Sequence, residues 1–319
     1  MLAKTDPPLL SIPAALAARL KGARLVNWCQ DLFPETAAAL GLRWAAGPVG
    51  RLLRRLRNWS LRQADCNVVL CDEMLSYLEA AGIAPRAQTG QGLRIVHNWP
   101  DPAIRPLPRE RRPGEPFTIC YSGNLGRAHA VGTVIELVER TRDLPGLRWR
   151  FVGGGAGFFR LRDHVDRQGI ANVSFEGYAP RSELPGSLAC ADAHLVSLDP
   201  ACEGLIQPSK IYGILASGRP ALFLGSPRGS VVGLLRQHAA GIALDMGDPA
   251  TWRPAIEALI GDTARLAAMG ANARRAHERH YAQAQALAAW RDVLLPVEVT
   301  APDGAEPSLT AENKAKVAA

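Results

Sequence analysis

From residue 117 onward, short apolar runs alternate with helical or turn-rich segments, and this alternation limits the fold more than any other feature of the sequence. Six runs read as strands: Phe117–Ser122, Trp149–Val152, Val173–Phe175, Ala193–Leu198, Ala221–Leu224 and Gly241–Leu244. Strands that alternate with helices predict a parallel sheet of the α/β class. In the common strand order 3-2-1-4-5-6, the loops after the first and fourth strands lie side by side where the order reverses.

Those two loops carry residues suited to binding an anion. The first is glycine-rich and spans residues 123–127, and the second runs from Asp199 to Gln207 into Pro208, Ser209 and Lys210. Pro208 predicts the first position of a helix, where free backbone N–H groups attract anions. Taken alone, the second loop is better explained by an ordinary loop-to-helix junction. Because the topology brings the two loops together, we predict a diphosphate-binding site.

The residues before the proline-rich stretch 100–113 predict a smaller sheet. Three apolar runs read as strands: Ala23–Cys29, Cys66–Cys71 and Leu93–His97. Since a doubly wound domain has about six strands, we expect this domain to be incomplete at its N-terminus. Gln30, Asp31 and Glu35 follow the first of these strands, where open α/β sheets bind ligands. Capping of the next helix is the alternative role for Asp31 and Glu35.

A basic helix is predicted between Gly41 and Arg62, a segment with six arginines and no acidic residue. One face of this helix carries Val49, Leu52, Leu53, Leu56 and Trp59. We expect this apolar face to pack on the protein's own core with the arginines in water, as is usual for amphipathic helices. The alternative is docking on an anionic membrane surface through Arg51, Arg54 and Arg55.

Composition limits the partners and the compartment. The formal net charge of +7 favours an anionic partner, but the chain has no nucleic-acid-binding motif, so nucleic acid is not expected. The six cysteines lack disulfide or metal-site spacing, which indicates reduced, buried thiols and a cytoplasmic protein. The N-terminus lacks a signal-peptide pattern, and no apolar run approaches the roughly 20 residues that cross a bilayer. Any membrane contact would therefore be peripheral, on the inner face of the cell membrane.

Five segments together resemble glycosyltransferase family 4, the retaining nucleotide-sugar transferases of the GT-B fold, and within it the bacterial exopolysaccharide and O-antigen branch. In family order they are residues 30–35 (Gln-Asp-Leu-Phe-Pro-Glu), 97–101 (His-Asn-Trp-Pro-Asp), 121–126 (Tyr-Ser-Gly-Asn-Leu-Gly), 151–155 (Phe-Val-Gly-Gly-Gly) and 208–220, from Pro-Ser-Lys to Gly-Arg-Pro.

The resemblance implies an α/β, GT-B-like architecture of two Rossmann-like domains with parallel sheets, the first incomplete. The expected division is a partial acceptor-side domain at 1–101, a linker at 102–116, a nucleotide-sugar-binding domain at 117–280, a crossover helix at 281–297 and a disordered tail at 298–319. The missing part of the first domain implies either a start codon assigned too late or a shortened protein with impaired catalysis.

The resemblance also implies roles for individual residues. Donor-binding residues would be Gly123, Asn124, Gly126, Arg127, Gly154, Tyr178, Gly204, Ser209 and Lys210. Catalytic residues would be Gln30, Asp31 and Glu203. Many members carry two glutamates separated by seven residues, whose positions here are Leu205 and Gly213, and many have a histidine where this chain has Gln30. Retention is expected by front-face attack assisted by the leaving phosphate, with no metal and no cofactor.

The leading hypothesis is a peripheral membrane glycosyltransferase. It would move a sugar from a nucleoside-diphosphate sugar to a lipid-linked or glycan acceptor in bacterial surface polysaccharide synthesis. The expected partners are that donor, that acceptor and an anionic membrane surface. The alternatives are a noncatalytic or truncated nucleotide-sugar-binding subunit and a GT-B-like sugar-nucleotide epimerase.

Overall fold

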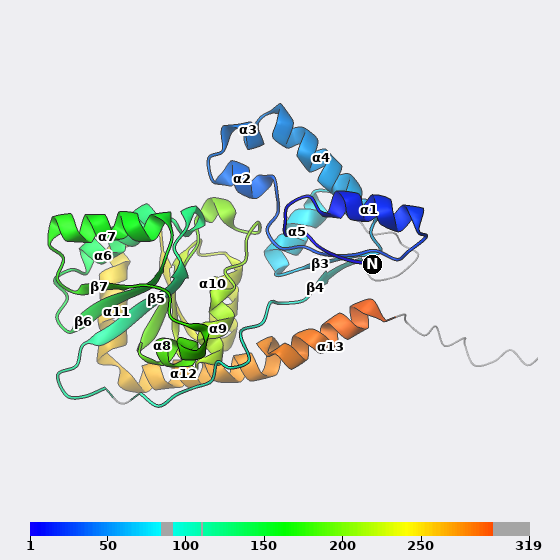
Figure 1. Cartoon of the computed structure of the whole chain (residues 1–319). Coiled ribbons are helices and arrows are strands. Elements are labelled where there is room, and N and C mark those ends of the chain that lie inside the picture. Colours follow the sequence, from blue (N-terminus) through cyan, green and yellow to red (C-terminus); the bar gives the residue numbers. More distant parts are fainter. Residues whose placement is uncertain (84–91, 110, 296–319) are drawn as a thin grey trace, which may run out of the picture.

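The computed structural model describes residues 1–83, 92–109 and 111–295, which form two α/β halves (Figure 1). The strands are β1 Leu2–Lys4, β2 Val26–Trp28, β3 Cys66–Val69, β4 Gly92–Ile95, β5 Phe117–Asn124, β6 Leu147–Gly154, β7 Val173–Glu176, β8 Ala193–Ser197, β9 Ala221–Gly225 and β10 Gly241–Asp245. The first half contains a four-stranded sheet in the order β1-β2-β3-β4, and the second a six-stranded sheet in the order β10-β9-β8-β5-β6-β7. Neighbouring strands in both sheets run parallel.

The helices of the first half are α1 Ser11–Leu20, α2 Glu35–Ala39, α3 Arg43–Ala46, α4 Pro48–Gln63 and α5 Asp72–Ala80. Those of the second half are α6 Val131–Arg140, α7 Ala156–Gln168, α8 Leu184–Ala189, α9 Lys210–Ala216, α10 Ser230–His238, α11 Trp252–Gly261 and α12 Thr263–Ala276. A π-helical turn, His277–Tyr281, joins α12 to the last helix, α13 Gln283–Leu294.

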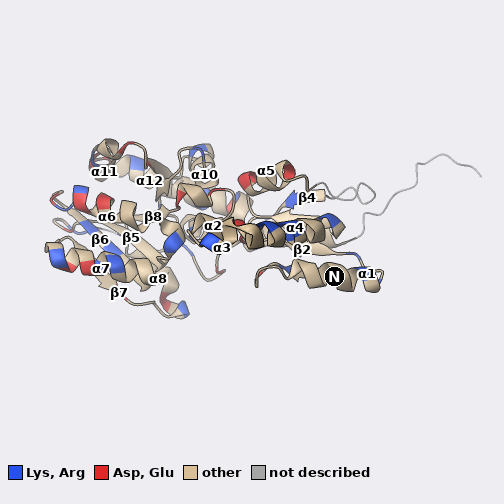
Figure 2. Cartoon of the chain, turned by 90° about the horizontal axis from the view of Figure 1, so that it is seen from above, with Lys and Arg blue, Asp and Glu red and all other residues tan. Residues whose placement is uncertain are grey.

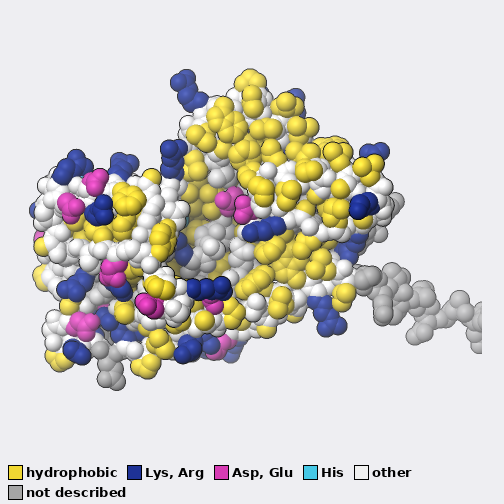
Figure 3. All heavy atoms as spheres, viewed as in Figure 1, with side chains coloured by type: hydrophobic (Ala, Val, Ile, Leu, Met, Phe, Trp, Pro, Cys, Tyr) yellow, Lys and Arg dark blue, Asp and Glu magenta, His cyan; other side chains and the backbone are white. Residues whose placement is uncertain are grey.

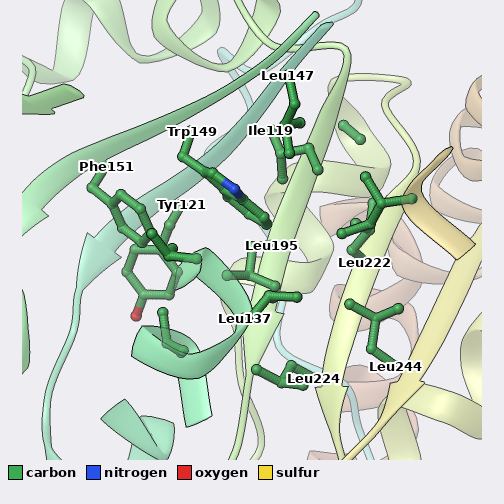
Figure 4. Packing of buried hydrophobic residues seen from close by; sticks show 14 of the residues in the cluster. Ile119, Tyr121, Leu137, Leu147, Trp149, Phe151, Leu195, Leu222, Leu224 and Leu244 are labelled. Carbon is green, nitrogen blue, oxygen red and sulfur yellow. The ribbon is translucent and has the colours of Figure 1, made fainter. Parts of the chain in front are cut away.

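The six-stranded sheet confirms the predicted strands and their order, with the first and fourth strands, β5 and β8, adjacent. Helices cover both of its faces, because two separate apolar clusters involve α6, α7 and α11 on one face and α9, α10 and α12 on the other. Trp149 and Phe151 of β6 and Tyr121 of β5 stack in the first cluster (Figure 4). The Trp149 indole donates a hydrogen bond to Thr141 Oγ1 at 2.9 Å, so this large polar side chain is buried without an unpaired donor.

The first half contains four strands in its described residues, and the prediction of three was wrong. The missed strand is β1, which pairs in parallel with β2 from Leu2 to Lys4. Three residues are too few to show a strand pattern, and alanine and lysine are uncommon in strands.

Helix α4 does not bury the apolar face that the sequence pattern predicts. Val49, Leu52 and Leu56 are 55%, 56% and 40% exposed, whereas Arg57, Ser60 and Leu61 are buried. Two polar contacts explain this orientation. Arg57 forms a buried ion pair with Glu35, and the hydroxyl groups of Ser60 and Ser11 lie 2.8 Å apart. Because a buried arginine is costly without its partner, this ion pair fixes which side of α4 faces the core.

Helix α13 leaves the second half and packs on the first sheet (Figure 1). The ring centroid of Trp290 lies 5.2 Å from that of Trp28 in an edge-on contact. Val293 also belongs to this apolar cluster, and Arg24 donates hydrogen bonds to the carbonyls of Val293 and Leu294 at 2.6 and 3.1 Å. Residues more than 260 positions apart in the sequence therefore pack together beside the first sheet.

Other predictions concern the remaining segments. In its described residues, the linker 102–116 carries no helix or strand, and its Arg109 pairs with Asp192 of the second half. The cysteines are free thiols, all buried except the exposed Cys190. The predicted disordered tail, 298–319, lies outside the described residues. Across the described ranges, no helix combines the length and the apolar character needed to cross a lipid bilayer.

Replacing Trp290 by alanine should lower the free energy of the first unfolding transition by about 3 kcal/mol, because the indole fills the core between α13 and the first sheet. Urea titration followed by circular dichroism measures this change. Leu287→Ala is the matched control, since Leu287 is on the same helix and 53% exposed, and it should change stability by less than about 0.5 kcal/mol. Equal effects of the two substitutions would contradict the crossover packing.

Candidate functional site

A cavity of about 560 Å³ lies between the two halves. Ser122, Gly123 and Asn124 at the end of β5 form one part of its wall, and residues 206–210 form another. Asp31 and Trp99 reach it from the first half and the loop that follows β4. The two loops expected at the reversal of strand order therefore do line one cavity.

The register of the sheet explains why a cavity opens at this point. β5 pairs with β6 over eight residues, from Phe117 to Asn124, but with β8 only through Ile119↔Ala193 and Cys120↔His194. Past Cys120, the two central strands are no longer paired with each other. The Nζ of Lys210 lies 3.6 Å from the ring centroid of Tyr121, the first residue of β5 past this pairing.

The Nζ of Lys210 is buried and has no hydrogen-bond partner among the described residues. Its Nζ lies 3.9 Å from the point where a Cβ on Gly123 would stand, so the two predicted loops meet at this atom. Desolvation by burial lowers the pKa of Lys210 to about 7. Burial, and to a smaller extent Lys210, lowers the pKa of His129 to about 4, which leaves that imidazole neutral. An anion in the cavity would supply the hydrogen-bond acceptor that Lys210 lacks.

The glycines of the first loop allow close approach of backbones. Gly123 has a φ of +119°, and a Cβ on Gly153 would lie 2.1 Å from the Gly123 carbonyl oxygen. The turn 153–155 therefore packs against the first loop and supports it rather than lining the cavity. Gly154 lies beneath the ring of Tyr178, which is 64% exposed and also outside the cavity wall.

Helix α9 begins at Lys210, two residues later than predicted. Pro208 precedes the helix, and Ser209, at the N-cap, makes no side-chain capping bond. The helix is seven residues long. Anion binding at this loop therefore rests on the side chain of Lys210, with the exposed Ser209 beside it on the cavity wall.

Three predicted donor-binding residues lie away from this wall. Arg127 lines a separate hollow with Arg160, at the starts of α6 and α7. Gly126 packs against the Asn124 side chain. Gly204 lies against the backbone of Glu73, where a Cβ would stand 3.2 Å from the Glu73 carbonyl oxygen. The structure does not bring these three residues to Lys210.

The predicted catalytic residue Glu203 is engaged elsewhere. Its Oε1 accepts hydrogen bonds from the backbone N–H and hydroxyl of Ser230, at 2.9 and 3.4 Å, at the start of α10. A carboxylate in this place satisfies free N–H groups and the helix dipole. Burial raises the pKa of Glu203. Its carboxylate thus holds α10 and does not line the cavity, which corrects the expectation for this residue.

Of the other two predicted catalytic residues, Asp31 lines the cavity and Gln30 does not. Asp31 is the single carboxylate among the described lining residues, and burial, followed by Asp6, raises its pKa. The backbone N–H of Gln30 donates to Thr5 Oγ1 at 3.1 Å, which fixes the loop that carries Asp31. The two positions implied for glutamates also differ, since Gly213 lines the cavity whereas Leu205 packs into the core of the first half.

Tyr121, His129 and Gln207 were missed by the sequence reasoning. The ring of Tyr121 lies under Lys210, and the Nδ1–H of His129 donates a hydrogen bond to the Ser197 carbonyl at 2.7 Å. Gln207 Oε1 accepts from Ser230 Oγ at 2.6 Å. The sequence placed Tyr121 in a strand and gave no signal that a lysine 89 positions later would contact its ring.

Comparisons with known proteins agree on one family. Residues 4–99 match the family model described as a glycosyl transferase 4-like domain. The chain is 25% identical to the probable glycosyltransferase WbjE of Pseudomonas aeruginosa over 293 residues, which are 89% of this chain and 71% of WbjE. It is 28% identical to the putative colanic acid biosynthesis glycosyl transferase WcaI of Escherichia coli strain K12 over 251 residues, 75% of this chain and 60% of WcaI.

Solved structures with GT-B folds are similar to most of the chain. Sucrose-phosphate synthase from Thermosynechococcus elongatus has a TM-score of 0.69 at 18% identity, with 89% of this chain and 71% of that chain covered. Anabaena Alr3699/HepE in complex with UDP also has a TM-score of 0.69, at 15% identity, with 89% of this chain and 74% of that chain covered. These likenesses establish the fold.

Replacing Lys210 by methionine should stabilise the unliganded protein at pH 7 by about 2 kcal/mol, because burial penalises the charged amine. The unfolded state binds a proton below pH 10.5, the ordinary pKa, and the folded state only below about 7. The advantage of methionine should therefore shrink as pH rises from 7 toward 10. Urea titrations at several pH values measure it, and a constant difference would contradict the buried charge.

Proposed function

We propose that the chain, a GT4-like glycosyltransferase with the GT-B fold, transfers a sugar from a nucleoside-diphosphate sugar. The acceptor is lipid-linked or a glycan, and the reaction belongs to bacterial surface polysaccharide synthesis. The observation that carries this proposal is the ammonium group of Lys210, which has no hydrogen-bond partner in the described ranges and lies beside the glycine-rich loop at Gly123. The similar protein HepE has been solved with UDP and with UDP-glucose. WcaI is named for colanic acid biosynthesis.

In this proposal, the donor's diphosphate lies between Gly123 and Lys210, with Asn124 and Ser209 as further contacts. Breaking the bond between the anomeric carbon and the phosphate oxygen leaves extra negative charge on the diphosphate. A cation held in a desolvated wall stabilises that charge strongly, because little water competes with it. Lys210 is the described cation lining this cavity, so it is assigned the largest contribution to the rate.

The proposed stereochemistry is retention by front-face attack. The acceptor oxygen bonds to the anomeric carbon, the carbon–phosphate oxygen bond breaks, and the leaving phosphate takes the acceptor's proton. A single carboxylate, Asp31, lies on the described wall of the cavity, and front-face attack needs no carboxylate base because the leaving phosphate takes the proton. Asp31 is assigned a positioning role, as an acceptor for a sugar hydroxyl.

The acceptor side is proposed to lie on an anionic membrane surface, which would place the protein peripherally on the inner face of the cell membrane. Arg51, Arg54 and Arg55 are exposed on α4 beside its exposed apolar residues. Figure 2 shows the basic residues along α4, and Figure 3 shows hydrophobic side chains gathered over α3 and α4. Apolar groups with neighbouring arginines match an interface between acyl chains and anionic headgroups.

Lys210→Ala should weaken UDP binding at pH 7 by at least about tenfold, since a charge-assisted contact to the diphosphate is lost. Isothermal titration calorimetry measures it. Between pH 7 and 9, where the phosphates are ionised, wild-type affinity should fall as Lys210 loses its proton, by up to about tenfold per unit, and the variant should show no such fall.

Lys21→Ala is the control for this measurement, since Lys21 is exposed after α1. It should bind UDP like the wild type. Unchanged UDP binding in Lys210→Ala would refute the proposed diphosphate site. Donor binding with neither sugar transfer nor donor hydrolysis would favour the noncatalytic subunit, and an epimerised donor sugar would favour the epimerase.

Replacing Arg51, Arg54 and Arg55 by glutamine should reduce sedimentation with phosphatidylglycerol vesicles by on the order of a hundredfold, at about 1 kcal/mol per arginine. The matched control replaces Arg160, Arg162 and Arg167, which are exposed on α7 of the second half. That variant should sediment like the wild type. Equal loss in both variants would indicate nonspecific attraction by net charge and would contradict docking through α4.

A further inference from the structure

We infer that Tyr121 is a positioning residue for the diphosphate site, an inference that rests on the function proposed above. Its ring holds the ammonium group of Lys210, and its hydroxyl group holds the glycine-rich loop at Gly123. Tyr121 is a fully buried residue of β5, and its ring stacks on that of Phe151 with the centroids 6.0 Å apart (Figure 4). One side chain thereby holds both groups that the donor's diphosphate is proposed to meet.

The ring of Tyr121 attracts the ammonium group of Lys210 without neutralising it. Nζ lies 3.6 Å from the ring centroid, well inside the roughly 6 Å limit of a cation–π contact. A carboxylate in the same place would cancel the charge of the amine and accept its N–H groups, whereas an aromatic face carries no net charge. These N–H groups have no hydrogen-bond acceptor in the described ranges. Both the charge and the donors of Lys210 therefore remain available to an anion.

The hydroxyl group of Tyr121 fixes the first loop. It donates a hydrogen bond to the carbonyl of Asn124 at 2.8 Å. Burial raises the pKa of Tyr121, so the phenol stays neutral and keeps the proton that it donates. Gly123 lies between these two residues, and a Cβ at its position would stand 3.9 Å from Lys210 Nζ. The loop and the ammonium group are thus both in contact with one rigid side chain.

The other titratable groups near Lys210 leave this contact in control around neutral pH. His129 meets the Tyr121 ring edge-on, with the centroids 5.9 Å apart, and burial lowers its pKa to about 4. His194 lines the cavity, and burial lowers its pKa to about 4 as well. Asp31 is the carboxylate on the described wall. Because both imidazoles are uncharged at pH 7, the Tyr121 ring is left in direct contact with the charge of Lys210.

The test replaces Tyr121 by phenylalanine or by a trifluorinated phenylalanine, which keeps the shape of the ring and weakens its negative face. The chain has five lysines, so carbon-13 NMR of labelled lysine follows the titration of Lys210, with Lys210→Met to assign its signal. The trifluorinated ring favours the neutral amine and should lower the pH at which Lys210 titrates by about one unit. Tyr121→Phe keeps the aromatic face and should leave this pH unchanged.

Calorimetry with UDP at pH 7 separates the two roles of Tyr121. Tyr121→Phe should weaken UDP binding about threefold, because the loop loses its hydrogen bond. The trifluorinated ring should weaken it by about another fivefold, because a smaller fraction of Lys210 carries a charge. A merely structural role would lower stability without moving the titration. UDP binding by Tyr121→Phe as tight as that of the wild type would overturn the role of the hydroxyl group.

The matched control places the same trifluorinated residue at Phe158, a buried ring of the same apolar cluster that meets Phe175 edge-on. Lys210 should then titrate as in the wild type. An unchanged titration with the fluorinated ring at position 121, or an equal shift from position 158, would overturn the inference. A singly fluorinated phenylalanine at position 121 should give a smaller shift in the same direction, which decides the matter if the trifluorinated protein does not fold. A shifted titration in a wild type that fails to bind UDP would instead overturn the proposed function.

Discussion

The short pairing between β5 and β8 is the constraint on which the site depends. Two register pairs join these central strands, at Ile119 and Cys120 of β5, and Thr118 exchanges hydrogen bonds with Asp192 just before β8. Beyond them, β5 continues along β6, and the turn at Ala128 and His129 bonds to Ser197 and Asp199 at the end of β8. The Nζ of Lys210 lies 3.6 Å from the centroid of the Tyr121 ring, next to the last residue of β5 that pairs with β8. The same two pairs hold the sheet continuous, so the fold obtains an open site without losing an intact sheet. A buried lysine with no acceptor is a cost to stability that an anionic ligand would relieve.

The loop at residues 203–207 joins the two halves around that site. Leu205 packs in the apolar core of the first half, and its carbonyl accepts the Leu32 N–H at 2.9 Å. On either side of Leu205, Glu203 holds the start of α10, and Gln207 bonds Ser230. One short segment thus belongs to the packing of both halves. This loop therefore connects the first half, which carries Asp31, to the second half, which carries Lys210.

The sequence predicted the second sheet well because its strands are buried on both faces and so read as apolar runs, and because the order of such strands follows common topology. Prediction from the sequence failed where individual tertiary contacts outweighed the hydrophobic pattern of a segment. The pattern of α4 could not reveal that Arg57 and Glu35 pair in the core, which turns Leu52 outward. Strand β1 was too short to show alternation. Lys210 was identified from its place in the chain, but its contact with Tyr121 depends on three-dimensional packing.

The packing of α13 on the first sheet has a consequence for biosynthesis. The cluster that contains Val26 and Val68 is completed by Ala286, Trp290 and Val293. A ribosome delivers the first half long before it delivers this helix, at roughly 5–20 residues per second. During that interval of many seconds, no helix in the described part of the first half covers this face of the sheet, and its valines can form non-native contacts. The second sheet has no such wait, because the helices on its two faces lie within the same continuous stretch. The first half, which the ribosome synthesises first, would therefore be the last part of the chain to complete its core.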